Sequence, residues 1–266
     1  MVKNRILLPA LILLILACRF FFAGEINRLF GIDPREMGPE AYFLYQAAWY
    51  LLPLLVVMPV IHPPAKILRE LGLAGGFLKG FLLAVLFTLP MFTAYAFFGQ
   101  WPEPENIGGI VFTALFAGFF EELFFRGFVF GQLFCRAKWG FVPASLVSGI
   151  FFGMGHLYQS HDLLRAAMIF GITFVGSAWF SWLFLESGKN LWLPLFLHVL
   201  MNLSWGLFSM DVTALGNWPA NLPRILTIAL SILYIVIFVR KQGPLTVRRH
   251  TLWMNRPSHD ERNDQG

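Results

Sequence analysis

The sequence predicts an all-α polytopic membrane protein with about eight transmembrane helices. Hydrophobic residues make up 57% of the 266 residues and charged residues only 13%, about half the charged fraction of a typical soluble domain. Several apolar runs reach the roughly 18 residues that a helix needs to cross a bilayer. The alternating polarity of a membrane β-barrel is absent from these runs, so helices are the expected spanning elements.

Eight apolar segments account for the predicted spans. Pro and Gly, which interrupt helices, fall between them, as at residues 33–34, 38–39, 62–64 and 102–104. Each segment is long enough for a hydrocarbon core of about 30 Å. The segments cover residues 6–23, 41–61, 76–98, 108–135, 141–158, 166–185, 190–209 and 224–239.

Lys and Arg are distributed unevenly over the predicted loops. With eight spans, fourteen lie on the side of the N-terminus and four on the other side. The positive-inside rule then predicts that both termini are cytoplasmic, in the inner membrane if the source is bacterial. Because these residues form no single patch, we expect a lipid bilayer and no nucleic acid as a partner.

The first apolar segment is predicted to remain in the mature protein, and the two cysteines are predicted to form no disulfide with each other. The first apolar run continues through residues 20–22 with no small-x-small site after it, so we expect a retained span and not a cleaved signal peptide. Cys18 and Cys135 are predicted at opposite faces of the membrane, which excludes a disulfide between them.

Ionisable side chains inside spans are the first candidates for function, because each costs about 3 kcal/mol to place in a bilayer. In the fourth span Glu122 and Arg126 are four residues apart and are expected to form an ion pair on one helix face. Glu121 is rotated by about 100° and lacks this partner, which makes it the candidate general base. The alternative is a packing salt bridge with a spare glutamate. Arg19, in the first span, receives no role.

Two further spans carry imidazoles. His156 closes a Gly-x-Gly-His sequence in the fifth span, whose glycines leave room for a neighbouring helix or a substrate backbone. His198 and Asn202 are four residues apart in the seventh span and share one face. Either feature alone is compatible with interhelical hydrogen bonding. Together with Glu121 they supply the base and the oxyanion donors that peptide hydrolysis requires.

These residues fall into three motifs, in the order found in the CPBP family of intramembrane proteases. The chain resembles this family, also called the Abi or CAAX-protease family, which includes the Ras-converting CAAX prenyl endopeptidase. The family's motifs are Glu-Glu-x-x-x-Arg, Phe-x-x-x-His and His-x-x-x-Asn. In this chain they are met by Glu121-Glu122 with Arg126, by Phe152 with His156, and by His198 with Asn202.

The resemblance implies an intramembrane endopeptidase that acts on a membrane-associated protein or peptide. It implies that Glu121 with His156 activates a water molecule and that His198 with Asn202 binds the oxyanion. It also implies supporting roles, which fall to Glu122, Arg126 and Phe152. The expected organisation is an N-terminal region of three spans (1–107), a protease-like membrane domain (108–210), the last span (211–240), and a basic, partly disordered cytoplasmic tail (241–266).

Three alternatives remain open. Glu121, His156 and His198 could form a two-His, one-carboxylate zinc site, although the tight His-Glu-x-x-His spacing is absent; we favour a mechanism that requires no cofactor, with zinc as the alternative. A catalytically idle scaffold or immunity protein is the second alternative, and a proton-coupled transporter is the third. The oligomeric state is not predicted.

The depth of His156 is a test of the four-residue site. Counted from residue 141, His156 lies roughly 22 Å along its helix, deeper than Glu121 and His198 would require. The fifth span must therefore tilt, begin later, or break at Gly153 or Gly155.

Overall fold

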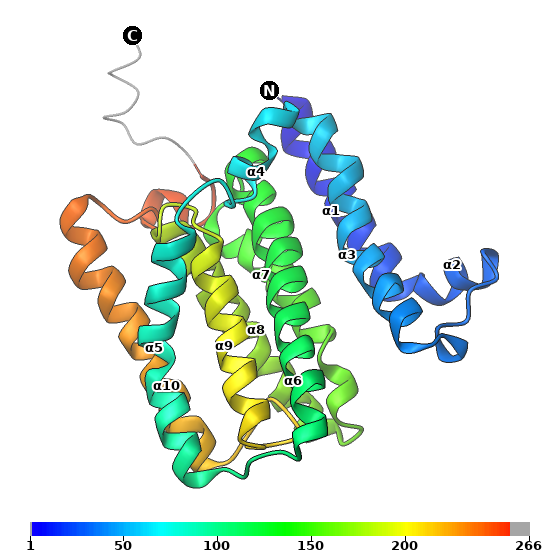
Figure 1. The fold of residues 1–266 in the computed structure, drawn as a ribbon. Coiled ribbons are helices and arrows are strands. Elements are labelled where there is room, and N and C mark those ends of the chain that lie inside the picture. The colour runs from blue at the N-terminus through cyan, green and yellow to red at the C-terminus, as the bar shows by residue number, and fades with distance from the viewer. Residues whose placement is uncertain (1, 256–266) are drawn as a thin grey trace.

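The computed structural model describes residues 2–255, which form an up-and-down helical bundle (Figure 1). Between residues 2 and 255 the only β-pairing is a single bridge between Trp139 and Met254, so the all-α prediction is confirmed. The α-helices are α1 (Val2–Phe21), α2 (Ala23–Leu29), α3 (Pro39–Ile61), α4 (Ile67–Glu70), α5 (Phe77–Phe98), α6 (Pro104–Phe116), α7 (Phe141–Met154), α8 (Leu163–Glu186), α9 (Trp192–Leu207) and α10 (Trp218–Tyr234).

Within the described residues, six helices are long and apolar enough to cross a membrane. A seventh is obtained if α1 and α2, which are bent by 76° relative to each other, count as one span. The helix α9 is apolar but has only 16 residues. The predicted membrane protein is therefore confirmed, while the predicted count of about eight is not.

The helices begin where the sequence carries start signals. Pro39 and Pro104 occupy the first turns of α3 and α6, where a missing N–H costs nothing. Asp162 caps α8 by accepting a hydrogen bond from the Arg165 N–H at 2.8 Å. Asn217 caps α10 through the Ala220 N–H at 3.2 Å. These positions agree with the predicted loops to within a few residues, except that α10 begins six residues earlier than residue 224.

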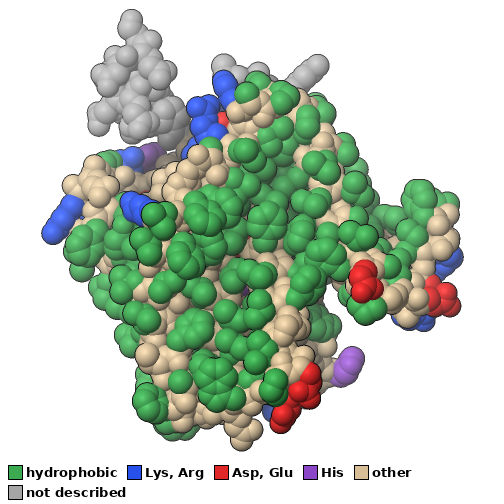
Figure 2. Space-filling view, in the orientation of Figure 1, with side chains coloured by type: hydrophobic (Ala, Val, Ile, Leu, Met, Phe, Trp, Pro, Cys, Tyr) green, Lys and Arg blue, Asp and Glu red, His purple; other side chains and the backbone are tan. Residues whose placement is uncertain are grey.

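The molecule has an α1–α3 pair on one side and a bundle of α5 to α10 on the other (Figure 1). In the bundle, α9 packs against α5 and α6, α7 packs against α8, and α10 covers α5. Large apolar side chains are exposed along the helices, whereas Lys and Arg gather at the end that carries the N-terminus (Figure 2). This arrangement is typical of helices that face lipid.

The segment after α10 packs against the end of the bundle. Buried Glu186 accepts hydrogen bonds from the backbone N–H groups of Thr246 and Val247, both at 2.8 Å. Residues 252 and 253 accept from the backbone at the start of α7. The first part of the predicted tail, 241–255, is therefore anchored, and the remainder, 256–266, lies outside the described residues.

Candidate active site

The helix that carries Glu121 changes its winding at the site. After Phe116, α6 continues as three π-helical segments, η3 (Ala117–Glu121), η4 (Leu123–Phe130) and η5 (Gln132–Arg136). The wider turn is rare and is found frequently at functional sites. It still brings residues four apart onto nearly the same face, so Glu122 and Arg126 meet as the sequence predicts.

A close approach at Gly118 brings this helix against α9. A Cβ at Gly118 would lie 2.9 Å from the Val199 backbone nitrogen and would also collide with the Val199 side chain. Because Glu121 follows Gly118 by one turn and His198 directly precedes Val199, the same contact places these two side chains next to each other. The missing Cβ at Gly118 therefore sets the spacing across the site.

We expect Gly118→Ala to push the two helices apart, because a methyl group has no space there. Overpacking of this kind costs about 1–3 kcal/mol, and the wider spacing should lower any activity that needs Glu121 beside His198. Unfolding in detergent with a parallel activity assay measures both effects. Gly108→Ala on the same helix is the matched control, since nothing lies within 4 Å of its Cβ position; equal behaviour of the two variants would contradict this expectation.

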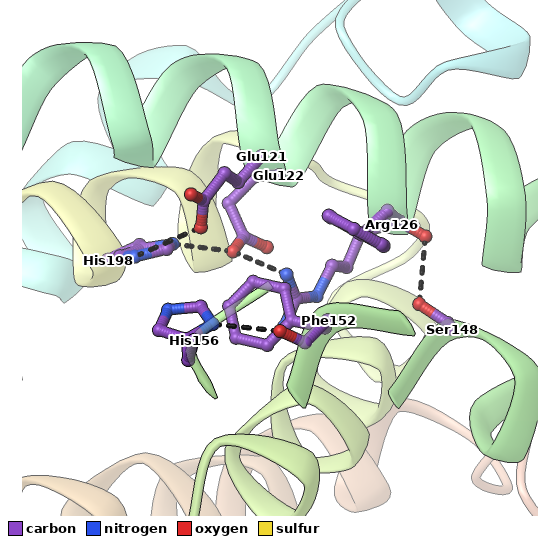
Figure 3. Close-up of polar contacts among 8 residues, drawn as sticks. Glu121, Glu122, Arg126, Ser148, Phe152, His156 and His198 are labelled. Atoms are coloured by element: carbon purple, nitrogen blue, oxygen red, sulfur yellow. Dashed lines mark hydrogen bonds and ion pairs between the residues drawn. The ribbon is translucent and has the colours of Figure 1, made fainter. Parts of the chain in front are cut away.

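Glu122 and Arg126 form a fully buried ion pair beneath the site. The Arg126 Nη1 lies 2.8 Å from Glu122 Oε1, and both side chains are 0% exposed. The same carboxylate oxygen accepts a hydrogen bond at 2.7 Å from His198 Nδ1 (Figure 3). The Arg126 guanidinium also lies over the ring of Phe152, 4.3 Å from its centroid, and over Phe180 at 5.2 Å. The ion pair predicted from the sequence is thus present, and the ring of Phe152 packs against the guanidinium of Arg126.

Glu121 points away from this pair. Its side chain is 18% exposed, and its Oε2 lies 4.0 Å from His198 Nε2. Oε2 has no hydrogen-bond partner in the part of the chain that the structure describes. Glu122 is therefore fixed by two partners at Oε1, whereas Oε2 of each glutamate has no hydrogen-bond partner among the described residues.

The fifth span, α7, ends just before His156. The α7 helix stops at Met154, and Gly155 is its C-cap, so a break at Gly155 is the one of the several possibilities that the structure contains. His156 then lies just beyond the helix, with its ring 4.6 Å from that of Phe152. Its Nδ1 lies 2.8 Å from the Phe152 carbonyl oxygen. Because a carbonyl only accepts, Nδ1 must carry the proton, and Nε2 of neutral His156 is left with a lone pair.

The four residues predicted to be catalytic line one cavity of about 470 Å³. Glu121 contributes from η3, His156 from the end of α7, and His198 with Asn202 from α9. Phe152 also lines this cavity, whereas Glu122 and Arg126 lie outside its lining. The sequence thus identified the polar groups that the fold brings together.

The sequence did not reveal which loop completes the lining of the cavity. Residues 211–214 line the cavity at the end of the bundle opposite to the N-terminus (Figure 1). Arg224 of α10 donates to the carbonyls of Ala214 at 2.7 Å and Leu215 at 3.1 Å, and Gln159 accepts from the Ala214 N–H at 2.8 Å. Arg224, the first residue of the last predicted span, therefore holds this segment in place. The signal in the sequence was the position of Arg224, a cation at the start of an apolar segment.

The residues named for zinc are not grouped as a set of metal ligands in the part of the chain that the structure describes. Tetrahedral zinc needs donors within about 2.0–2.2 Å of one point. Among residues 2–255, no group of three or more His, Cys, Asp and Glu side chains is arranged to hold a metal ion. The inner nitrogen of each imidazole is engaged, His156 Nδ1 by a carbonyl and His198 Nδ1 by Glu122. These contacts use Nδ1 and leave Nε2 of each ring, which is also the arrangement of histidines that bind zinc, so the zinc alternative stays open.

Comparisons with known proteins agree with the motifs. A family model described as type II CAAX prenyl endopeptidase Rce1-like matches residues 103–204. The chain is 28% identical over 216 residues to a Bacillus subtilis (strain 168) protein named as a membrane peptidase, YdiL, covering 73% of this chain and 80% of that protein. It is 26% identical over 145 residues to CAAX prenyl protease 2 of Methanococcus maripaludis, covering 48% of this chain and 52% of that protein.

No solved structure matches the chain significantly. The matched segment, 103–204, contains all seven residues of the three motifs and the helices that place them around the cavity. The first three predicted spans lie outside it. Over this segment the chain is therefore similar to the Rce1-like CAAX-type membrane proteases.

Proposed function

We propose that the protein is an intramembrane endopeptidase that hydrolyses a peptide bond in a membrane-associated protein or peptide. The observation that carries the proposal is the shared cavity of Glu121, His156, His198 and Asn202. General-base and oxyanion groups must surround one reacting carbonyl, and here they come from three separate helices. The relatives named as a membrane peptidase and a prenyl protease support the same reaction class.

In this proposal Glu121 and His156 activate the water. The Glu121 carboxylate accepts a hydrogen bond from one O–H of the water, and the bare Nε2 of His156 accepts a hydrogen bond from the other. The water oxygen then attacks the scissile carbonyl carbon as Glu121 takes one proton, which gives a tetrahedral oxyanion. When the oxyanion collapses and the C–N bond breaks, Glu121 passes this proton to the leaving nitrogen, so that an amine leaves and the carboxylate is regenerated.

His198 and Asn202 serve the developing oxyanion. His198 keeps Nδ1–H donated to Glu122, so only its imidazolium form can also donate from Nε2. Asn202 lies one turn further along α9 and adds an amide donor. Donors fixed before the reaction are the largest single source of rate enhancement in many hydrolases.

We propose that this chemistry needs no metal, because a carboxylate can act as the general base for water on its own. We further propose that both termini are cytoplasmic, because Lys and Arg gather at the end of the bundle that carries the N-terminus (Figure 2). On that assignment, the segment at residues 211–214 lies towards the opposite face of the membrane.

Purified protein in detergent should cleave members of a library of membrane-associated peptides, prenylated and unprenylated, with products identified by mass spectrometry. We expect the rate to change less than about twofold in a strong chelator, since no metal takes part. Loss of cleavage in chelator that added zinc restores would establish the metalloprotease alternative. No cleavage of any peptide, or equal cleavage by wild type and Glu121→Gln, would contradict the proposed function.

A further inference from the structure

A groove on the outer surface of the bundle meets the active-site cavity. It lies between α6 and α9, which pack side by side (Figure 1), and its volume is about 530 Å³. Thr113, Asn202 and Trp205 line both this groove and the cavity that contains Glu121. Because α6 begins a candidate membrane span, the groove connects the surrounding bilayer with the active site.

One face of the helix leads from the groove to the catalytic carboxylate. Asn106 and Thr113 line the groove, and Thr113, Ala117 and Glu121 line the cavity. At 1.5 Å per residue, Thr113 lies about 12 Å and Asn106 about 22 Å from Glu121 along the helix. An extended chain at about 3.3 Å per residue covers these lengths in about four and seven residues. The groove therefore has the length of a short extended peptide.

Thr113 differs from the other threonines of the spans in its hydrogen bonding. Thr88, Thr93 and Thr173 each donate the hydroxyl to the carbonyl four residues earlier, at 2.7 Å. Thr113 is exposed in the groove, and neither its hydroxyl nor the Asn106 side chain hydrogen-bonds to any residue that the structure describes. A polar group without a partner is costly in a bilayer, so the groove calls for a ligand that forms hydrogen bonds.

A polypeptide backbone meets this requirement and a hydrocarbon chain does not. A peptide bond inside an α-helix has its carbonyl engaged by the N–H four residues later, so a membrane segment must unwind before it is cut. The unwound N–H and C=O groups then need new partners within the bilayer. A threonine hydroxyl and an asparagine amide can each donate and accept, whereas an acyl or prenyl chain would leave both without a partner.

We propose that the groove between α6 and α9 binds an extended segment of the substrate polypeptide, about four to seven residues from the scissile bond, with Thr113 hydrogen-bonded to its backbone. The inference rests on the proposed function and adds the form of the substrate, which is a membrane-embedded peptide that reaches Glu121 between two helices. Its approach is from the end of the bundle at which α6 begins, opposite to the N-terminus (Figure 1).

The first test is photo-cross-linking in the Glu121→Gln background, which should bind the substrate without cutting it. Benzoylphenylalanine in place of Asn106 should capture a membrane peptide that the wild type cleaves, and mass spectrometry should map the link about seven residues from the cut bond, on one side only. The matched control is the same photo-reactive residue in place of Thr93, which lines a separate groove between α5 and α10. Equal capture at both positions, or lipid adducts alone in saturating peptide, would overturn the proposal.

The second test is steady-state kinetics on Thr113→Val, which keeps the side-chain volume and removes the hydroxyl. We expect KM to rise about three- to tenfold with kcat changed less than about twofold, because the lost hydrogen bond is made equally in the bound substrate and in the transition state. Thr93→Val is the matched control, since Thr93 is also exposed but bonds within its own helix; it should keep the wild-type KM.

A shortened substrate checks where the hydroxyl acts. A peptide with fewer than about four residues on each side of the cut does not reach Thr113, so Thr113→Val should leave its KM unchanged. Wild-type KM for the long peptide in Thr113→Val would contradict the groove as its binding site. Glu121→Gln separates the two claims: if it is inactive while Thr113→Val is normal, only this inference fails, and if it is fully active the proposed function fails.

Discussion

Replacing Glu121 with Gln is expected to lower kcat by at least about 1,000-fold. The amide has nearly the same shape as the carboxylate but cannot take a proton from water, and general-base catalysis contributes about 100- to 10,000-fold. Folding should be preserved, because the substitution removes a charge from an apolar region and leaves the buried Glu122–Arg126 ion pair intact. Peptide cleavage followed by mass spectrometry measures the first effect, and the unfolding temperature in detergent measures the second.

The adjacent Glu122 provides the comparison for this result. Glu122→Gln is expected to destabilise the protein by about 3 kcal/mol, because it leaves the fully buried Arg126 cation unpaired. Its direct effect on kcat should be smaller than that of Glu121→Gln, since a glutamine oxygen can still accept from His198 Nδ1. If Glu121→Gln were the unstable variant and Glu122→Gln the inactive one, the roles of the two carboxylates would have to be exchanged.

The sequence predicted the spans and the polar residues of the site because both depend on local signals. A transmembrane helix is recognised from the length of its apolar run, and α3, α5 and α8 begin within three residues of the predicted positions. An ionisable residue inside such a run is conspicuous. The Glu122–Arg126 pair and the break after Met154 follow from spacing and from glycine, and the structure contains both.

Features that depend on contacts between helices were not predicted. The π-helical winding of residues 117–136 has no periodic signature in a run that is apolar on every side. The contact of Arg19 with Tyr50 requires α1 and α3 to lie against η3, and hydropathy does not specify neighbours. The contact of Arg224 with residues 214 and 215 depends on the path of a loop. The two missed contacts each involve an arginine, so every intramembrane cation in such a chain should be assigned a partner.

The substitution Arg126→Met is expected to destabilise the protein by about 3–5 kcal/mol, the largest effect on stability among the changes considered. Methionine keeps much of the side-chain volume but leaves Glu122 as a buried anion whose remaining partner is His198. Removing one member of a buried ion pair costs this much because the other charge stays in a medium of low dielectric constant. The cation also loses its contacts with Phe152 and Phe180. Chemical unfolding in detergent measures the change.

Two further variants separate the unpaired charge from lost packing. The double variant Arg126→Met with Glu122→Gln should recover most of the stability, since a buried pair replaced on both sides is often neutral. Arg136→Met is the matched control on the same helix: this arginine is exposed and donates only to the Ile61 carbonyl, at 3.3 Å, so the change should stay within about 0.5 kcal/mol. Equal destabilisation by the single and double variants would assign the loss to packing around Phe152, and the buried anion would then contribute little to it.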